Sequence, residues 1–191
     1  MESQRVSTGQ AAAAAGVLMT IGVEGEWLLN PQRDDGTVTN MPVFALLLLI
    51  ATAGFVLLLA AVLGLRRTTA RRTRPAQAGA ALTVAGAGLL SLFVASTLVT
   101  AIPTGAPWAA TFIAFILGML LLAVGPVTWG LSLRRQPPAP GVWQMLVVSG
   151  VASFAALAIE PDPWHDLCLV VMFAAWSVLG ALLIRRVDAV L

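Results

Sequence analysis

Residues 43–65 read VFALLLLIATAGFVLLLAAVLGL, an apolar run without a charged side chain, and Arg66 and Arg67 follow it directly. A helix of about 20 apolar residues spans the roughly 30 Å hydrocarbon core of a bilayer. Arginine in the connection after such a run keeps that end of the helix at the membrane surface. The stretch therefore predicts a transmembrane helix and points to an all-α membrane protein.

The composition of the whole chain favours the same environment. Hydrophobic residues make up 59% of the 191 residues and charged residues only 10%, whereas a soluble domain carries about 25% charged residues. Because so little polar surface cannot cover a globule in water, we expect the lipid bilayer to surround the protein. No nucleic-acid partner is expected, since the sequence has neither a basic helix nor interleaved aromatic residues.

Further apolar segments predict a polytopic protein, a single bundle of six transmembrane helices over residues 1–191. The first segment is the weakest, because its apolar core at 11–23 is too short to span a bilayer and must extend toward Leu29. Small residues are dense in the first and third segments, which predicts central positions for these two helices. The predicted helices cover about 8–29, 43–65, 78–101, 108–133, 142–159 and 167–184.

Charges in the connections predict the orientation of the bundle. All eleven basic residues are arginine, and only Arg33 falls on the side where seven of the nine acids lie. Arginine in short loops stays in the cytoplasm, so we expect both termini to be cytoplasmic. A chain rich in Ala and Gly that uses arginine alone is typical of a high-GC bacterium, which makes the bacterial inner (cell) membrane the expected location.

Two acids, Glu24 and Glu26, follow the first apolar run directly. On a helix these two side chains point in nearly opposite directions, so at least one carboxyl enters the outer leaflet if the helix continues to Leu29. A carboxyl held in lipid is a candidate acid or proton carrier. The alternative is that both carboxyls lie in water and mark the end of the helix.

The turn before the last segment holds three carboxylates and the only histidine, His165. Glu160, Asp162 and Asp166 are therefore candidates for acid/base catalysis. The alternative is a solvated turn that caps the next helix, because negative charge is favourable at a helix N-terminus. One histidine with flexible carboxylates is a poor ligand set, so we expect no metal and no cofactor.

Aromatic side chains near these acids are candidates for substrate binding, because such rings stabilise a cation in an apolar site. Trp176 and Phe173 lie in the last segment, while Trp27 and Trp164 lie at the outer boundary. The alternative for Trp176 is packing. Trp27, Trp164 and, at the inner boundary, Trp129 also fit an interfacial aromatic belt.

The segment from Gly16 to Arg67, which begins GVLMTIGVEGEWLLNPQ and ends LGLRR, resembles the start of small six-helix membrane proteins of uncharacterised families from high-GC bacteria. This resemblance implies a fold and no activity. The acids around Glu24 and Asp166 give the chain a looser similarity to the membrane-bound terpene cyclases, small helical bundles that use membrane-embedded carboxyls to protonate a prenyl chain. That similarity implies a carboxyl proton donor and an isoprenoid-like substrate.

Three functions remain open from the sequence. The first is an intramembrane acid/base enzyme, a terpene cyclase-like lyase or isomerase acting on a lipophilic, isoprenoid-like small molecule. The second is a small-solute transporter or substrate-capture subunit, in which the stripe of Ala11 and Ala15 would dock a partner protein. The third is a structural or accessory membrane protein without catalysis, and the sequence names no protein partner.

Overall fold

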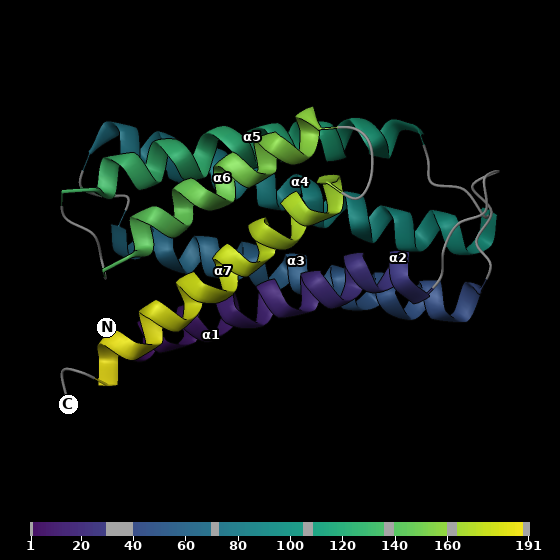
Figure 1. Ribbon diagram of the computed structural model, residues 1–191, viewed down its shortest axis with the longest axis horizontal. Coiled ribbons are helices and arrows are strands. Elements are labelled where there is room, and N and C mark those ends of the chain that lie inside the picture. Colours follow the sequence, from purple (N-terminus) through teal and green to yellow (C-terminus); the bar gives the residue numbers. More distant parts are fainter. Residues whose placement is uncertain are drawn as a thin grey trace.

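The structure, a computed structural model, describes residues 2–29, 40–69, 73–104, 109–135, 140–159 and 164–188. Nearly all of these residues are helical, and five of the helices are long and apolar enough to cross a membrane (Figure 1). The remaining one, Val142–Ala158, is apolar but shorter. The predicted fold class, an all-α helical membrane bundle, is confirmed.

The first rod of the bundle contains a change of helix type. It runs as α1 (Glu2–Met19), a π-helical turn η1 (Thr20–Glu24) and α2 (Gly25–Leu29), so the helix does continue through Glu24 to Leu29. Five further helices follow in chain order: α3 (Met41–Thr69), α4 (Arg74–Thr104), α5 (Ala109–Leu133), α6 (Val142–Ala158) and α7 (Trp164–Asp188).

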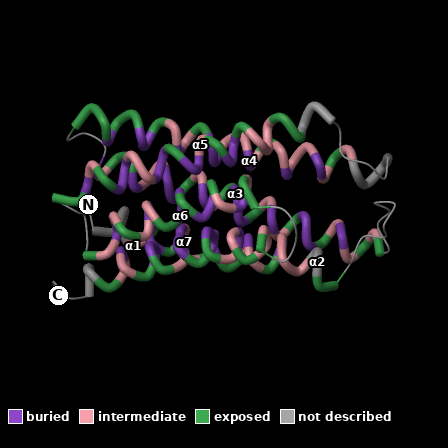
Figure 2. Tube along the Cα trace, turned by 45° about the horizontal axis from the view of Figure 1, so that its top comes forward, coloured by how far each residue is buried: buried purple, intermediate pink, exposed green. Residues whose placement is uncertain are grey.

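The six rods close into a ring, in which each rod packs chiefly against two neighbours. The order around the ring is α1, α3, α4, α5, α6 and α7, and α7 returns to α1. Figure 2 shows buried residues alternating with exposed residues along every rod. The prediction that the first and third helices are central is wrong, since α1 and α4 have two main neighbours like the others. Small residues indicate that a helix packs closely against a neighbour. They do not indicate a central position, because in a ring every helix can have two such neighbours.

Glycines set the close contact between α1 and α7. A Cβ added to Gly9 would lie 2.9 Å from the carbonyl oxygen of Gly180, and one added to Gly16 would collide with the Phe173 carbonyl oxygen. Ala15 on the same helix is fully buried. Ala15 therefore belongs to the protein's own core, against which Ala11 also packs. A partner protein could not reach Ala15 in this structure.

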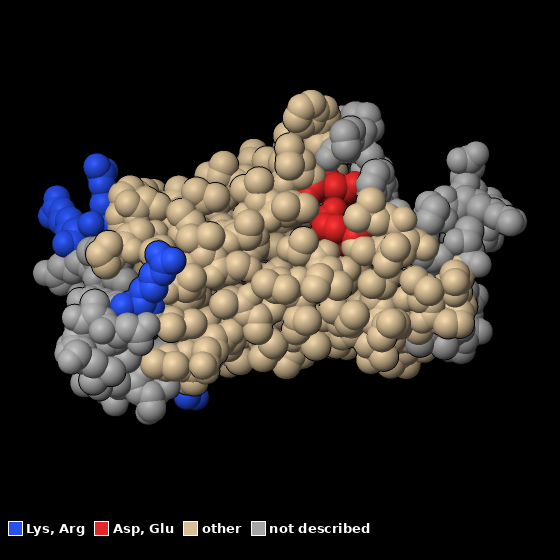
Figure 3. All heavy atoms as spheres, turned by 60° about the horizontal axis from the view of Figure 1, so that its bottom comes forward, with Lys and Arg blue, Asp and Glu red and all other residues tan. Residues whose placement is uncertain are grey.

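Charge divides the bundle along its long axis. The start of α1 and the end of α7 lie at one end of the bundle (Figure 1), and the described arginine side chains gather there (Figure 3). The acidic atoms in Figure 3 lie in the other half. The opposite end is called the outer end below, and its position outside the cytoplasm stays a prediction.

The α6–α7 hairpin stops short of the outer end. The helix α6 has 17 residues, whereas α3 has 29 and α4 has 31, so α6 is shorter by roughly 20 Å at 1.5 Å per residue. Figure 1 shows α6 and α7 ending well before the tips of α3, α4 and α5. As a result, the first turn of α7 lies against the flank of the bundle instead of at its tip.

Candidate functional site

A cavity of about 140 Å³ lies inside the ring, in its outer half. Its walls come from η1, α3, α4, α5 and α7, and none of its lining residues comes from α6. Apolar cavities of roughly 150 Å³ stay dry and take ligands of the size of benzene. The space is therefore large enough for a hydrocarbon segment of about five or six carbons, such as one isoprene unit.

Four phenylalanines give the cavity its aromatic character: Phe55, Phe93, Phe115 and Phe173. Phe55 and Phe173 meet edge to face, with ring centroids 6.3 Å apart and planes at 83°. Phe93 and Phe115 form a tilted pair with centroids 5.2 Å apart. Two aromatic pairs, from α3 with α7 and from α4 with α5, thus face the same apolar space.

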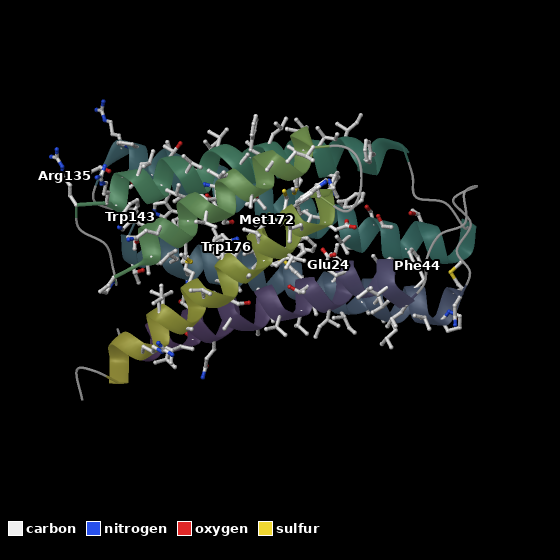
Figure 4. The ribbon with its side chains drawn as sticks, viewed as in Figure 1. Glu24, Phe44, Arg135, Trp143, Met172 and Trp176 are labelled. Carbon is white, nitrogen blue, oxygen red and sulfur yellow. The ribbon has the colours of Figure 1, made fainter. Side chains whose placement is uncertain are left out.

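Two carboxyls follow or precede lining residues in the chain, toward the outer end, although neither carboxyl lines the cavity itself. Glu24 follows the lining residue Val23 directly, and Asp166 precedes the lining residue Leu169 by one helical turn. Both are half-buried, and they are close enough for their charges to repel each other. Figure 3 shows the acidic atoms side by side at the surface, and Figure 4 places Glu24 outward from Met172.

The two carboxyls also share a depth in the bundle. In the first rod, Glu24 lies about 19 residues from Arg5, and in α7, Asp166 lies about 19 residues from Arg185. Each separation is roughly 28 Å of helix. The hydrocarbon core of a bilayer is about 30 Å thick. If the arginines mark one boundary of that core, the carboxyls lie at the other boundary with the cavity beneath them.

The π-helical turn η1 sets the position of Glu24. Within it, Gly22 packs directly on α3, where an added Cβ would lie 2.5 Å from the Ala51 backbone nitrogen. Thr20 Oγ1 donates a hydrogen bond to the Gly16 carbonyl oxygen at 2.9 Å. Single π-turns inside α-helices are frequent at functional sites, because they change the direction of the side chains that follow. One carboxylate oxygen of Glu24 is buried and has no hydrogen-bond partner among the described residues.

His165 joins the ends of α6 and α7 beside the carboxyls. Its Nδ1 lies 2.6 Å from the carbonyl oxygen of Ala156. Because a carbonyl oxygen only accepts, Nδ1 must carry the hydrogen, and Nε2 is left to accept or donate according to the charge of the ring. This bond ties the first turn of α7 to the last turn of α6.

The structure brings together two of the residues predicted from the sequence, Glu24 and Asp166, and it places a third, Phe173, in the wall of the cavity. Trp176 is fully buried one turn further from the outer end than Phe173, and it does not line the cavity. Trp164 is 61% exposed at the start of α7. Glu160 and Asp162 lie outside the described residues, as do the side chains of Glu26 and Trp27.

Sequence reasoning missed most of the cavity wall, including Phe55, Phe93, Phe115 and Met172. These residues lie in segments that are apolar all round, so hydrophobic periodicity carries no signal for the side that faces inward. Trp129, expected in an interfacial belt, is 0% exposed inside the bundle. The belt interpretation of Trp129 is wrong, since depth along a helix does not determine which face of the helix a ring occupies.

Within the described part of the chain, no three side chains of His, Cys, Asp or Glu come close enough to hold a metal ion. No family model and no curated protein matches the sequence, and no solved structure matches the fold.

Proposed function

We propose that this protein is an intramembrane acid/base enzyme that isomerises or cyclises an apolar, isoprenoid-like substrate. One observation carries the proposal: a cavity walled by four phenylalanines has two neighbouring carboxyls, Glu24 and Asp166, at its outer side. An ionisable group inside a membrane protein is costly and is therefore a functional candidate. An apolar space beside it supplies the place for a substrate that does not need polar contacts.

The chemistry begins with a proton on one of the two carboxyls, Glu24 or Asp166, where it relieves the repulsion of the two charges. Transfer of this proton to a carbon–carbon double bond leaves a carboxylate and a carbocation. The phenylalanine faces stabilise the cation while it rearranges or closes a ring. The cation then loses a proton from a neighbouring carbon to the carboxylate, so nothing is consumed and the product is an isomer of the substrate.

The membrane setting suits such a reaction in two respects. Prenyl chains partition into lipid, and the cavity lies in the part of the bundle that lipid surrounds. An apolar, water-poor site also protects a carbocation from hydrolysis and strengthens its electrostatic contacts. The cavity holds about one isoprene unit, so the rest of a longer prenyl chain would lie outside it.

The test is an assay of the full chain in lipid nanodiscs supplied with farnesene or squalene in D₂O, with the products analysed by mass spectrometry. We expect isomers of the substrate that carry one deuterium, because the proton that starts the reaction comes from an exchangeable carboxyl. Glu24→Gln keeps the shape of the side chain but cannot donate this proton, so the rate should fall about 100-fold or more.

Arg135→Gln serves as the control, because Arg135 is exposed at the arginine-rich end, away from the cavity. This variant should keep the wild-type rate, and both variants should unfold at similar temperatures. Product without deuterium, or a Glu24→Gln variant at full rate, contradicts the proposed mechanism. If no isomer forms from either hydrocarbon, the enzyme proposal fails for this substrate class.

A further inference from the structure

Three fully buried polar side chains are left without a hydrogen bond among the described residues: Ser149 on α6, Trp176 on α7 and, on α5, Trp129. Ser149 and Trp176 are each 1% exposed. Neither the hydroxyl oxygen of Ser149 nor the indole Nε1 of Trp176 has a partner in the described part of the chain. Buried polar groups are almost always hydrogen-bonded, so each exception requires a physical explanation.

Ser149 and Trp176 lie at the same level of the α6–α7 contact. One turn nearer the outer end, Ser153 Oγ donates to the sulfur of Met172 at 2.8 Å. The two helices run in opposite directions, so one turn back along α6 and one turn forward along α7 lead to the same depth. Those steps lead from Ser153 to Ser149 and from Met172 to Trp176, and Figure 4 shows Met172 and Trp176 along α7.

Of the two groups, Trp176 requires an outside acceptor more strongly. A serine hydroxyl can rotate and donate to its own helix, as Ser153 does to the Ser149 carbonyl oxygen at 2.8 Å. The indole N–H is fixed in the plane of a large buried ring and has no such alternative. An oxygen near Nε1 would satisfy Trp176, and the hydroxyl of Ser149 lies at the same depth on the neighbouring helix.

The pair also lies directly beneath the cavity. Met172 and Phe173 line the cavity, and Trp176 follows them on the next turn of α7 away from the outer end. Ser149 is on α6, which contributes none of the lining residues. The polar pair is therefore separate from the carboxyls, which lie on the opposite, outer side of the same cavity.

We propose that Ser149 and Trp176 form a buried subsite for one hydrogen-bonding oxygen atom, with Trp176 Nε1 as its donor. This oxygen comes either from the ligand in the cavity, as an alcohol or carbonyl, or from a single water molecule. The ligand source rests on the proposed function and narrows its substrate to an oxygenated isoprenoid. The water source does not depend on any substrate.

The first experiment compares farnesol with farnesene, which have chains of the same length, for binding to the full chain in nanodiscs by native mass spectrometry. A ligand oxygen in the subsite predicts that farnesol binds about threefold to tenfold more tightly, the contribution of one neutral hydrogen bond. Trp176→Phe keeps an aromatic ring but removes the donor, so it should abolish this preference without weakening farnesene binding.

Trp143→Phe is the matched control. Trp143 lies at the arginine-rich end, with the Arg134 guanidinium 5.7 Å from its ring centroid. This substitution removes an indole N–H far from the cavity, so the preference for farnesol should remain. Loss of the preference in both variants would mean that the effect does not come from Trp176 Nε1, and it would contradict the ligand source.

The second experiment needs no ligand and measures thermal unfolding of Ser149→Ala, Trp176→Phe and the double variant. A water shared by the two side chains predicts that the double variant loses less stability than the sum of the single losses, because the first substitution already breaks the bridge. Such coupling without a farnesol preference assigns the oxygen to water. Additive losses together with an unchanged ligand preference overturn the subsite. If neither isoprenoid binds, the proposed function fails, and the unfolding measurement alone decides the subsite.

Discussion

Individual side chains decide whether the ring encloses a space or a filled core. Val94 on α4 is buried and lines the cavity together with the four phenylalanines. A larger residue at this position would occupy space that a substrate segment needs. Val99 on the same helix is 72% exposed, so the same change there adds volume on the outside of the bundle.

We therefore expect Val94→Phe to block the cavity. Photolabelling with a diazirine analogue of farnesol in nanodiscs should drop several-fold, while the temperature of unfolding stays constant or rises, because filling a cavity commonly adds about 0.5–2 kcal/mol of stability. Val99→Phe should leave both the labelling and the stability unchanged. Equal labelling of the wild type and Val94→Phe would show that farnesol binds elsewhere on the protein.

At the scale of elements, glycine positions determine how closely the rods approach. Gly180 on α7 packs on the backbone of α1, and a Cβ added there would collide with the Gly9 carbonyl oxygen and the Ala13 nitrogen. Gly88 on α4 is different, since a Cβ added to it meets nothing within 4 Å. Both positions lie inside helices, where alanine is intrinsically better than glycine by about 1 kcal/mol.

These contacts predict opposite signs for the same substitution. Gly180→Ala should lower the free energy of unfolding by about 1–3 kcal/mol, because backbone atoms of α1 cannot move aside as a flexible side chain can. Gly88→Ala should keep or raise the stability, through helix propensity alone. Unfolding in a mild detergent measures both, and a stabilised Gly180→Ala would show that α1 and α7 do not pack as closely as described.

For the whole molecule, the decisive property is the separation of charge along the long axis. The described arginines gather at the end where α1 starts and α7 ends, and the carboxyls of Glu24 and Asp166 lie in the other half. Because short arginine-rich connections stay in the cytoplasm, we predict that the carboxyls and the cavity lie in the outer leaflet. A substrate would therefore reach the site from that leaflet.

Cysteine labelling tests this orientation. Asn40 precedes α3 at the outer end, and Thr73 precedes α4 at the arginine-rich end. Both side chains are exposed, and each accepts a hydrogen bond from a backbone N–H in the first turn of the helix that follows it. In a Cys168→Ala background, a membrane-impermeant maleimide should label Asn40→Cys in intact cells but not Thr73→Cys. Each variant loses one helix cap, so their stabilities are matched. The reverse labelling pattern would contradict the predicted orientation and place the carboxyls in the cytoplasmic leaflet.

The fold class and the separation of charge along the bundle could be predicted from local sequence patterns. Long apolar runs can satisfy their backbone hydrogen bonds in lipid only as helices, so the helices could be located without knowing their neighbours. The carboxyls of Glu24 and Asp166 were also identified from the sequence, because charged residues next to an apolar run are conspicuous in any arrangement.

Only the tertiary structure decided which faces of those helices meet and what they enclose. In segments that are apolar all round, nothing in the sequence distinguishes a phenylalanine that faces lipid, such as the 57% exposed Phe112, from one that faces the cavity, such as Phe55. The ring order, the short α6–α7 hairpin and the π-helical turn together bring Glu24 and Asp166 close to each other, toward the outer end from a cavity that four phenylalanine rings line. Contacts between residues far apart in the chain create that arrangement, so local sequence patterns could not predict it.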